Sequence, residues 1–472
     1  MTHATRRVAV VGSSVAAMMA TLTLAEEDWH VTLITPTAKL GGHFAGLSVA
    51  GHLFDAGMVF LEFTAFNASR DADLATYQPG RRNDAGRFVS IVEQTLSRFG
   101  NWRTVEAPQM RIGDQIYPDM LIANALTALA QLPTPLRAQM ARELADARGN
   151  TRAQFHPRHK TTDPEFAQYD LETVSVANHG YTFHHEFIEP FCRKVTAGTS
   201  ASLAALYHRM AWLPLYYPET LASALAGEPP SLPDTRFSYP TSGTIATLVH
   251  QLEAQIRAMP QVRVLAARID TMSTSTDRPV MRLAPDETVT VDRVVWAAEP
   301  ESLLALSGLE LTASLDRASL TLASVLVKAS ALRDAFSTLL LPEETHWPFR
   351  ITNQSRAAGQ QEPMARLSCE WNSAFLTGDA DAMATRTRDA LVELGVVARA
   401  DDVADVRVHV FRDALPLPSP ANIARSLARS QRLDSRLPTV PRIGPAAPFG
   451  ATSLNDQIIQ GLKVGRELEV TA

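Results

Sequence analysis

The residues best suited to chemistry near the start of the chain form a glycine-led turn between an apolar strand and an apolar helix. The strand is Arg7–Val11, and the turn reads Gly12-Ser13-Ser14-Val15. Such a turn leaves backbone N–H groups at a helix N-terminus, where the helix dipole favours phosphate. It predicts a Rossmann-type unit that holds a dinucleotide pyrophosphate on Gly12, Ser13, Ser14 and Val15. An ordinary strand–helix turn is the alternative, because serine and alanine replace the second and third glycines of G-x-G-x-x-G.

Two arginines are the side chains expected to act on a substrate. Arg350 and Arg366 occur in strand-like segments, and a guanidinium binds phosphate or carboxylate through two parallel hydrogen bonds. We therefore assign both as catalytic and expect an anionic substrate. Glu370 follows Arg366 by four residues, so a structural Arg366–Glu370 ion pair is an equally good interpretation.

Histidines gather between residues 156 and 208, but their spacing does not predict a metal site. Adjacent residues such as His184 and His185 diverge by about 100° on a helix, so they are not expected to face one pocket. Cys192 and Cys369 are the only cysteines and are far apart. Neither a disulfide framework nor a metal site is expected from them.

After the first helix, a second strand, His30–Thr35, precedes a basic residue, a Gly-Gly pair and an Asp55-Ala-Gly57 turn. These residues resemble the FAD-dependent family of amine oxidases, protoporphyrinogen oxidase, phytoene desaturases and UDP-galactopyranose mutase. The family has its flavin above that turn, and its second strand ends in a glutamate that binds the adenosine ribose. Threonine at that position offers one hydroxyl instead of a charge-assisted hydrogen bond. The resemblance implies FAD contacts at Thr35, Lys39, Gly41, Gly42, His43 and Gly57.

Later segments resemble the mutase-like branch of this family, found in polysaccharide gene clusters. Matching segments include His179–Val195, Phe237–Gly243 and Val291–Pro300, in family order. The resemblance implies adenine contact at the strand carrying Ile269. It implies contact with the flavin pyrophosphate and ring at Gly444, Asn455, Asp456 and Gln457. Asn455 and Asp456 suit helix N-capping equally well.

The chain departs from the sugar mutases where their chemistry is concentrated. Gly57-Met-Val-Phe60 replaces a Gly-Pro-His turn, and Ala414–Pro418 occupies the place of a tyrosine. A true sugar mutase is therefore not expected.

The fold class expected is α/β, with a discontinuous Rossmann-type FAD-binding domain, a helical insertion and an antiparallel-sheet substrate domain. The apolar or alternating segments Ala323–Ala329 and Ala365–Trp371 support the second sheet independently. The FAD-binding domain is expected in three parts, with the other two regions between them. In chain order, the boundaries are 1–65 for its first part, 66–236 for the helical insertion, 237–310 for its second part, 311–430 for the substrate domain and 431–472 for its third part.

Composition bounds the function. The 472 residues are 46% hydrophobic and carry a net charge of −6, so nucleic acid is not an expected partner. No leader or bilayer-spanning run is apparent, which favours a cytoplasmic protein, alone or as a homo-oligomer. We expect a flavin-dependent oxidoreductase, or redox-neutral flavoenzyme, acting on a small anionic metabolite in glycan or secondary-metabolite biosynthesis. The alternative is a non-catalytic fold relative that has lost flavin and serves as a binding or scaffold subunit.

Overall fold

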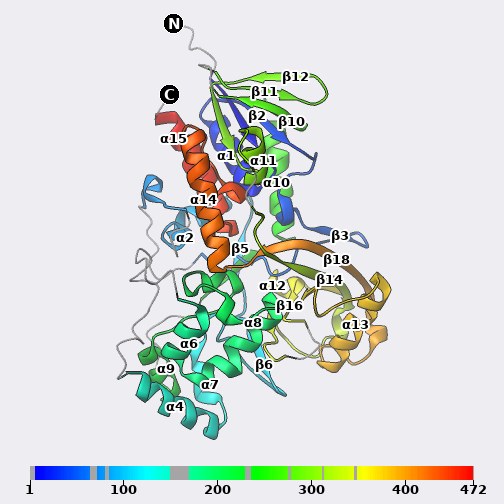
Figure 1. Cartoon of the computed structure of the whole chain (residues 1–472). Helices are drawn as coiled ribbons and strands as arrows, with labels where there is room; N and C mark the ends of the chain where they lie inside the picture. The colour runs from blue at the N-terminus through cyan, green and yellow to red at the C-terminus, as the bar shows by residue number, and fades with distance from the viewer. Residues whose placement is uncertain are drawn as a thin grey trace.

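The computed structural model describes residues 6–63, 72–79, 84–148, 169–228, 235–274, 278–310, 313–344 and 348–470. The chain ends lie near each other at one end of the molecule, beside a parallel sheet, and the helical insertion lies at the opposite end (Figure 1). Among the described helices, none combines the length and the apolar character that crossing a membrane requires.

The first layer is a parallel sheet with strand order β13-β1-β2-β9. Its strands are β1 (Arg7–Val11), β2 (His30–Thr35), β9 (Val262–Ala266) and β13 (Arg293–Trp296). Side chains alternate between its two faces, so Val8 and Val10 enter one core while Ala9 and Val11 enter another. Both faces are therefore covered, as in other parallel sheets.

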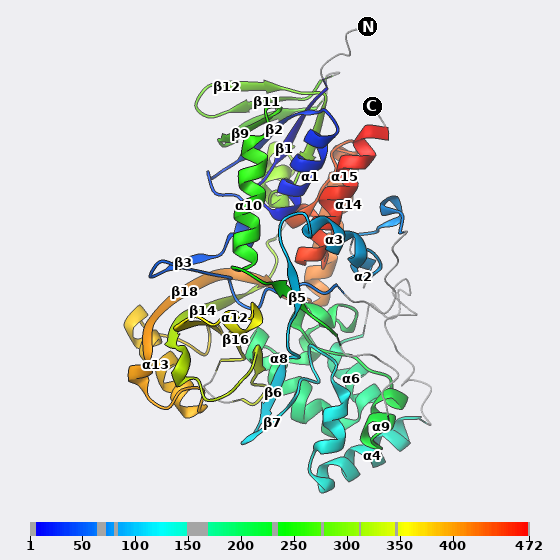
Figure 2. The same cartoon turned by 180° about the vertical axis from the view of Figure 1, so that it is seen from behind.

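Three helices cover one face of this sheet, with α1 (Val15–Glu26) between α10 (Ile245–Ala258) and α15 (Leu454–Val470) (Figure 2). The opposite face packs on a small sheet of β10 (Ile269–Ser273), β11 (Val280–Leu283) and β12 (Glu287–Thr290). Helices α11 (Pro300–Leu306) and α14 (Pro420–Arg436) contribute to the same core. The short helices α2 (Asp84–Arg87) and α3 (Val89–Leu96) pack against α15.

The second layer is a larger sheet with order β18-β14-β17-β16-β15-β6-β7. Its strands are β6 (Gln109–Ile112), β7 (Gln115–Pro118), β14 (Arg317–Lys328), β15 (Thr338–Leu340), β16 (Arg350–Asn353), β17 (Met364–Asn372) and β18 (Val403–Pro416). The five strands between residues 317 and 416 pair antiparallel, as expected for the substrate domain. The hairpin β6–β7 precedes them in the chain and extends the same sheet, because β6 pairs parallel with β15. Helix α13 (Ala380–Glu393) packs on the sheet beside β18.

The helical insertion lies beside the second sheet, at the end of the molecule opposite the parallel sheet (Figures 1 and 2), and its core includes sheet residues such as Met110 and Leu340. Its helices are α4 (Thr134–Arg148), α6 (Leu171–His179), α7 (Tyr181–Phe183), a π-helical turn (His184–Ile188), α8 (Glu189–Thr196) and α9 (Pro218–Leu225). Phe183, Phe187 and Phe191 are all fully buried there. Lys194 joins the insertion to the second sheet, since its buried Nζ donates to the carbonyls of Leu341 and Pro348.

The smaller elements connect these layers. They are β3 (Leu47–Val49), β4 (His52–Phe54), β5 (Trp102–Thr104), β8 (Ser238–Pro240) and α12 (Gln354–Ala357). Strand β4 leads directly into the Asp55–Gly57 turn, and β8 leads toward the start of α10. These connections bring the dinucleotide domain and the second sheet together.

Candidate functional site

The turn after β1 requires glycine at position 12. Gly12 has φ +133°, and a Cβ there would lie 2.4 Å from the carbonyl oxygen of Ala297. Its own N–H donates to Ile34 O at 2.8 Å. The turn is therefore closed against β2 and the end of β13, and a side chain would break that packing.

Ser14 occupies the second glycine position and caps α1. Its Oγ accepts the N–H of Ala17 at 3.3 Å and donates to Ala297 O at 3.1 Å. In the described part of the chain, the backbone N–H groups of Ser14 and Val15 have no hydrogen-bond partner, although both residues are buried. Such N–H groups at a helix N-terminus favour an anion.

Helix α15 runs parallel to α1 and brings a second N-terminus to the same place. Gly461 and Gly465 permit this contact, since a Cβ on Gly461 would lie 2.8 Å from Ala16 O. In the first turn of α15, Gln457 Oε1 accepts the N–H of Ala16 at 3.4 Å. Two helix dipoles thus direct their positive ends toward one region, and this further favours an anion.

The Gly41–Gly42 turn adjoins the Gly12 turn. Gly41 N–H donates to Ser13 O at 2.6 Å, and Gly41 adopts φ +92°. A Cβ on Gly42 would meet nothing within 4 Å, so this residue faces open space. His43 is exposed beside it, and its ring centre lies 3.8 Å from that of Phe44 with the planes tilted by 40°. The predicted residues of both glycine turns therefore lie together.

Two residues predicted to bind the cofactor have partners within their own loop. Thr35 is fully buried, and its Oγ1 donates to Thr37 O at 2.9 Å. Lys39 Nζ donates to Gly46 O at 3.2 Å. The ribose hydrogen bond expected from Thr35 is not available in this arrangement, because the hydroxyl closes the turn that follows β2. Ile269, the residue predicted for the adenine, begins β10 and is partly buried.

Asp55 is the centre of a buried network that fixes the turn expected beneath the flavin. Its carboxylate accepts the N–H groups of Ile245 and Ala246 at 3.2 and 2.8 Å, and it also accepts the hydroxyl of Tyr239. The amide of Gln354 bonds to both backbone groups of Asp55 at 3.0 Å. Burial raises the pKa of Asp55 to about 6, although these hydrogen bonds and the charge of Arg366 lower it.

The partner of Glu370 is Arg350, and the expected Arg366–Glu370 pair was wrong. Arg350 Nε and Nη2 each lie 2.6 Å from a Glu370 carboxylate oxygen. The two residues face each other in the register of β16 and β17. The guanidinium carbon also lies 4.4 Å from the centre of the Trp212 ring, a cation–π contact. The two N–H groups of Arg350 that could bind an anion side by side, on Nε and Nη2, are thus already bound to Glu370.

Glu370 also supports the Asp55–Gly57 turn. Its Oε2 accepts the N–H of Met58 at 3.1 Å, and a Cβ on Gly57, which has φ +92°, would lie 2.7 Å from its Oε1. Arg366 contacts the opposite end of the same turn, since its Nη1 donates to Leu53 O at 3.0 Å and its Nη2 donates to Gln360. The two predicted catalytic arginines therefore flank one turn, and each has internal partners.

The residues around the start of α15 either cap this helix or contact neighbouring segments. Ser453 is the residue that caps Asp456 N–H, at 3.1 Å, which corrects the expected cap at Asn455 or Asp456. Asp456 accepts the hydroxyl of Tyr77 at 2.7 Å. Gly444 adopts φ +58° and stands against Ser14, where a Cβ would lie 2.8 Å from the serine Oγ. Only a residue without a side chain fits between these two turns.

Glu62 is a partly buried acid near the start of α15 that the sequence analysis did not single out. It is half-buried between the buried Leu61 and Phe63, and Asn455 Nδ2 donates to its backbone oxygen at 3.1 Å. Burial raises the pKa of its carboxyl, while the charge of Arg209 lowers it. The sequence did contain an indication of this residue, because Glu62 is the one acid in the apolar segment 58–63.

No protein-family model matches the chain, and no curated protein matches it. Solved structures match it over nearly its whole length. Reduced UDP-galactopyranose mutase matches with a TM-score of 0.74 and 13% identity, over 99% of this chain and 96% of that chain. The chain has the fold of that mutase.

Two oxidases give the same result. Putrescine oxidase bound to putrescine matches with a TM-score of 0.61 and 11% identity, over 99% of both chains. Cyclohexylamine oxidase from Brevibacterium oxydans IH-35A matches with a TM-score of 0.60 and 12% identity, again over 99% of both chains. The expected fold class is confirmed.

Proposed function

We propose that this protein binds FAD and catalyses a redox or redox-neutral reaction on a small metabolite. The observation that carries the proposal is the shared N-terminal region of α1 and α15. There, the unpaired N–H groups of Ser14 and Val15 and two parallel helix dipoles suit a pyrophosphate. Gly42 lies next to the same turn and faces open space, which leaves room for the parts of FAD on either side of the pyrophosphate.

The chain's own residues have separate roles in this proposal. The backbone N–H groups of Ser14 and Val15 would hold the pyrophosphate, Gly12 permits the close turn that presents them, and the Asp55–Gly57 turn would lie beside the ring. Glu370 and Arg366 hold that turn at its two ends. Bound FAD would supply the chemistry through its isoalloxazine ring, as a hydride acceptor or a transient nucleophile.

Glu62 is the proposed acid–base group. Burial raises the pKa of this half-buried carboxyl above its ordinary value, which is the direction that a general acid requires. Its link to Asn455 holds it at the N-terminal turn of α15, close to the proposed cofactor site. Glu62→Gln should lower turnover and remove the acidic limb of its pH profile while FAD binding is retained.

The substrate is proposed only as a small metabolite of glycan or secondary-metabolite biosynthesis, on the resemblance to the mutase-like branch. An anionic substrate was expected from free guanidinium groups at Arg350 and Arg366. Both groups are bound within the protein, so they give no support to a negative charge on the substrate.

A second function is favoured by the buried Thr35. Because its hydroxyl closes its own turn, the ribose lacks the partner that the family provides there. This favours the non-catalytic alternative, a binding or scaffold subunit without flavin. An absorption spectrum of the purified full chain, with chromatography of any released cofactor, separates the two functions. A chain that neither contains nor takes up FAD would be the binding or scaffold subunit. A chain that takes up NADP instead of FAD would contradict the cofactor assignment.

Two variants locate the site. Gly12→Val should abolish FAD retention, since its side chain would meet Ala297 O. Ser14→Asp keeps a competent helix cap but places a negative charge beside the pyrophosphate. It should weaken FAD binding at least about tenfold, which is about 1.4 kcal/mol. Ser419→Asp, at the N-cap of α14, is the matched control and should bind normally. Equal binding by all three variants would contradict the site.

A further inference from the structure

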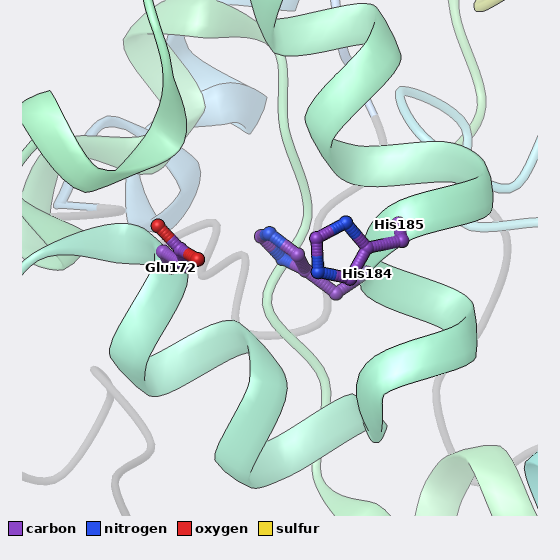
Figure 3. Close-up of side chains that lie close together, drawn as sticks. All are labelled: Glu172, His184 and His185. Carbon is purple, nitrogen blue, oxygen red and sulfur yellow. The ribbon is translucent and has the colours of Figure 1, made fainter.

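The helical insertion holds a cluster of metal-binding side chains that the proposed flavin chemistry does not use. It consists of Glu172 on α6 and of His184 and His185 on the π-helical turn. One ligand atom from each residue lies within 4.8 Å of the other two. Figure 3 shows the carboxylate on one helix and the two rings on the facing turn.

The two histidines converge because their backbone is not α-helical. Residues His184–Ile188 form a π-helical turn, which is wider than an α-helical turn and is frequent at functional sites. The ring centres are 5.0 Å apart, with the planes at 85°. The expectation that these side chains diverge was therefore wrong. Of the histidines in this stretch, His156 and His159 lie outside the described residues.

A buried chain of hydrogen bonds determines which nitrogen of His184 carries a lone pair. Tyr216 N–H donates to His179 Nε2 at 2.7 Å, so the proton of that ring is on Nδ1. This Nδ1–H donates to Ser175 Oγ at 3.0 Å. The Ser175 hydroxyl in turn donates to His184 Nδ1 at 2.9 Å. His184 Nδ1 therefore has the lone pair.

The other nitrogen of His184 has the partners of a metal-bound histidine. His184 Nε2 lies 3.3 Å from Ser200 Oγ and 3.8 Å from Glu189 Oε2. Ser200 also donates to Glu189, so this carboxylate is held in place. Metal-bound histidines typically donate their second N–H to such a group, which fixes the orientation of the ring. His184 and Ser200 are fully buried, so the arrangement is rigid.

We propose that Glu172, His184 and His185 form a zinc site, with His184 Nδ1 as the innermost ligand and a water as the fourth. Two imidazoles and one carboxylate with an open position are a donor set that Zn²⁺ accepts. Ser175 Oγ lies 2.9 Å from His184 Nδ1, so the Ser175 hydroxyl must rotate away from this nitrogen to admit a zinc ion at about 2.0–2.1 Å. Zinc bonds of about 2.0–2.1 Å in a tetrahedron place ligand atoms about 3.4 Å apart, so the side chains must close by about 1.4 Å at most from 4.8 Å. Glu172 and His185 are only half-buried and can make this movement.

The test uses the full chain, freed of metal with a chelator and titrated with ZnCl₂ by calorimetry. We expect one Zn²⁺ per chain. His185→Gln and Glu172→Gln should weaken binding about 100-fold or more, because each removes a direct ligand. Ser200→Ala, which acts through the orientation of His184, should weaken it about 10–100-fold. His30→Gln, on the exposed start of β2, is the control and should bind as the wild type does.

Folding is monitored separately by the melting temperature of each metal-free variant. Because Glu172 and His185 are half-buried, their variants should melt as the metal-free wild type does, and neither should gain the stabilisation by Zn²⁺ that the wild type and the control show. Absence of binding to the wild type would overturn the site. Binding that survives in both His185→Gln and Glu172→Gln, or that is lost equally in His30→Gln, would overturn it too.

Discussion

Removing the charge of Glu370 should strongly destabilise the second sheet. Arg350 is only 2% exposed, and its two bonds to Glu370 are its neutralising contact. Glu370→Gln keeps the size of the side chain but turns an amide N–H₂ toward a guanidinium donor. The guanidinium is then left charged and unpaired in a dry environment.

The magnitude follows from the burial of the pair. Breaking a buried ion pair on one side costs about 3–5 kcal/mol, since the remaining charge is uncompensated. Met58 N–H shares the same carboxylate at 3.1 Å, and a weakened hydrogen bond there adds about 1 kcal/mol. We therefore expect a loss of about 4–6 kcal/mol in the free energy of unfolding.

Urea denaturation followed by tryptophan fluorescence is the assay, because Trp212 stacks on the affected guanidinium. Glu253→Gln is the matched control. It removes the carboxylate of an i,i+4 pair with Arg257 on α10, whose side chains are 20% and 42% exposed, and should cost less than about 1 kcal/mol. Adding Arg350→Met to Glu370→Gln should restore part of the lost stability. A loss below about 1 kcal/mol in Glu370→Gln, or a double variant weaker than the single one, would refute the reasoning.

Three further predictions concern other buried contacts. The pKa of Asp55 is raised from 3.8 to about 6, so its contribution to stability is complete below pH 3.8 and is lost as the pH rises through 6. Urea denaturation at several pH values should show that the wild type loses up to about 3 kcal/mol of unfolding free energy over that range, relative to Asp55→Asn. Burial lowers the pKa of Lys194 from 10.5 to about 7. Wild-type stability should therefore rise with pH between those values, and Lys194→Met should lack the rise. Gly461→Leu should cost about 1–3 kcal/mol by forcing α1 and α15 apart, as measured by the melting temperature, whereas Gly100→Leu, where a Cβ would meet nothing within 4 Å, should not.

Features that depend on local sequence were predictable. The turn at Gly12 needs a strand, a glycine and a helix in succession, and all three are visible within eleven residues of sequence. The fold class followed because such motifs recur in one order along the chain. The sequence shows a threonine at position 35, but it does not show that the Thr35 hydroxyl donates to Thr37 O, because residue type alone does not reveal this contact.

Contacts between strands and helices were not predictable in the same way. Arg350 and Glu370 are twenty positions apart and meet only through the register of β16 and β17. Spacing along the chain favoured Arg366 instead, because it is four residues from Glu370. The convergence of His184 and His185 was missed since the spacing rule assumed an α-helix, and the π-helical turn arises from packing. Glu62 was overlooked because its significance depends on its distant neighbour Asn455.

The parallel pairing of α1 with α15 has a consequence for biosynthesis. Helix α1 is translated before α15, and several hundred residues separate the two helices in the chain. Until α15 arrives, Ala16 and Met19 expose the surface that Gly461 later covers, and the first turn of α1 lacks Gln457. The nascent chain therefore stays unable to enclose a nucleotide while several hundred residues are added, and closure is a late, long-range event. A cell making this protein must keep an apolar face at one end of the polypeptide from aggregating throughout that interval.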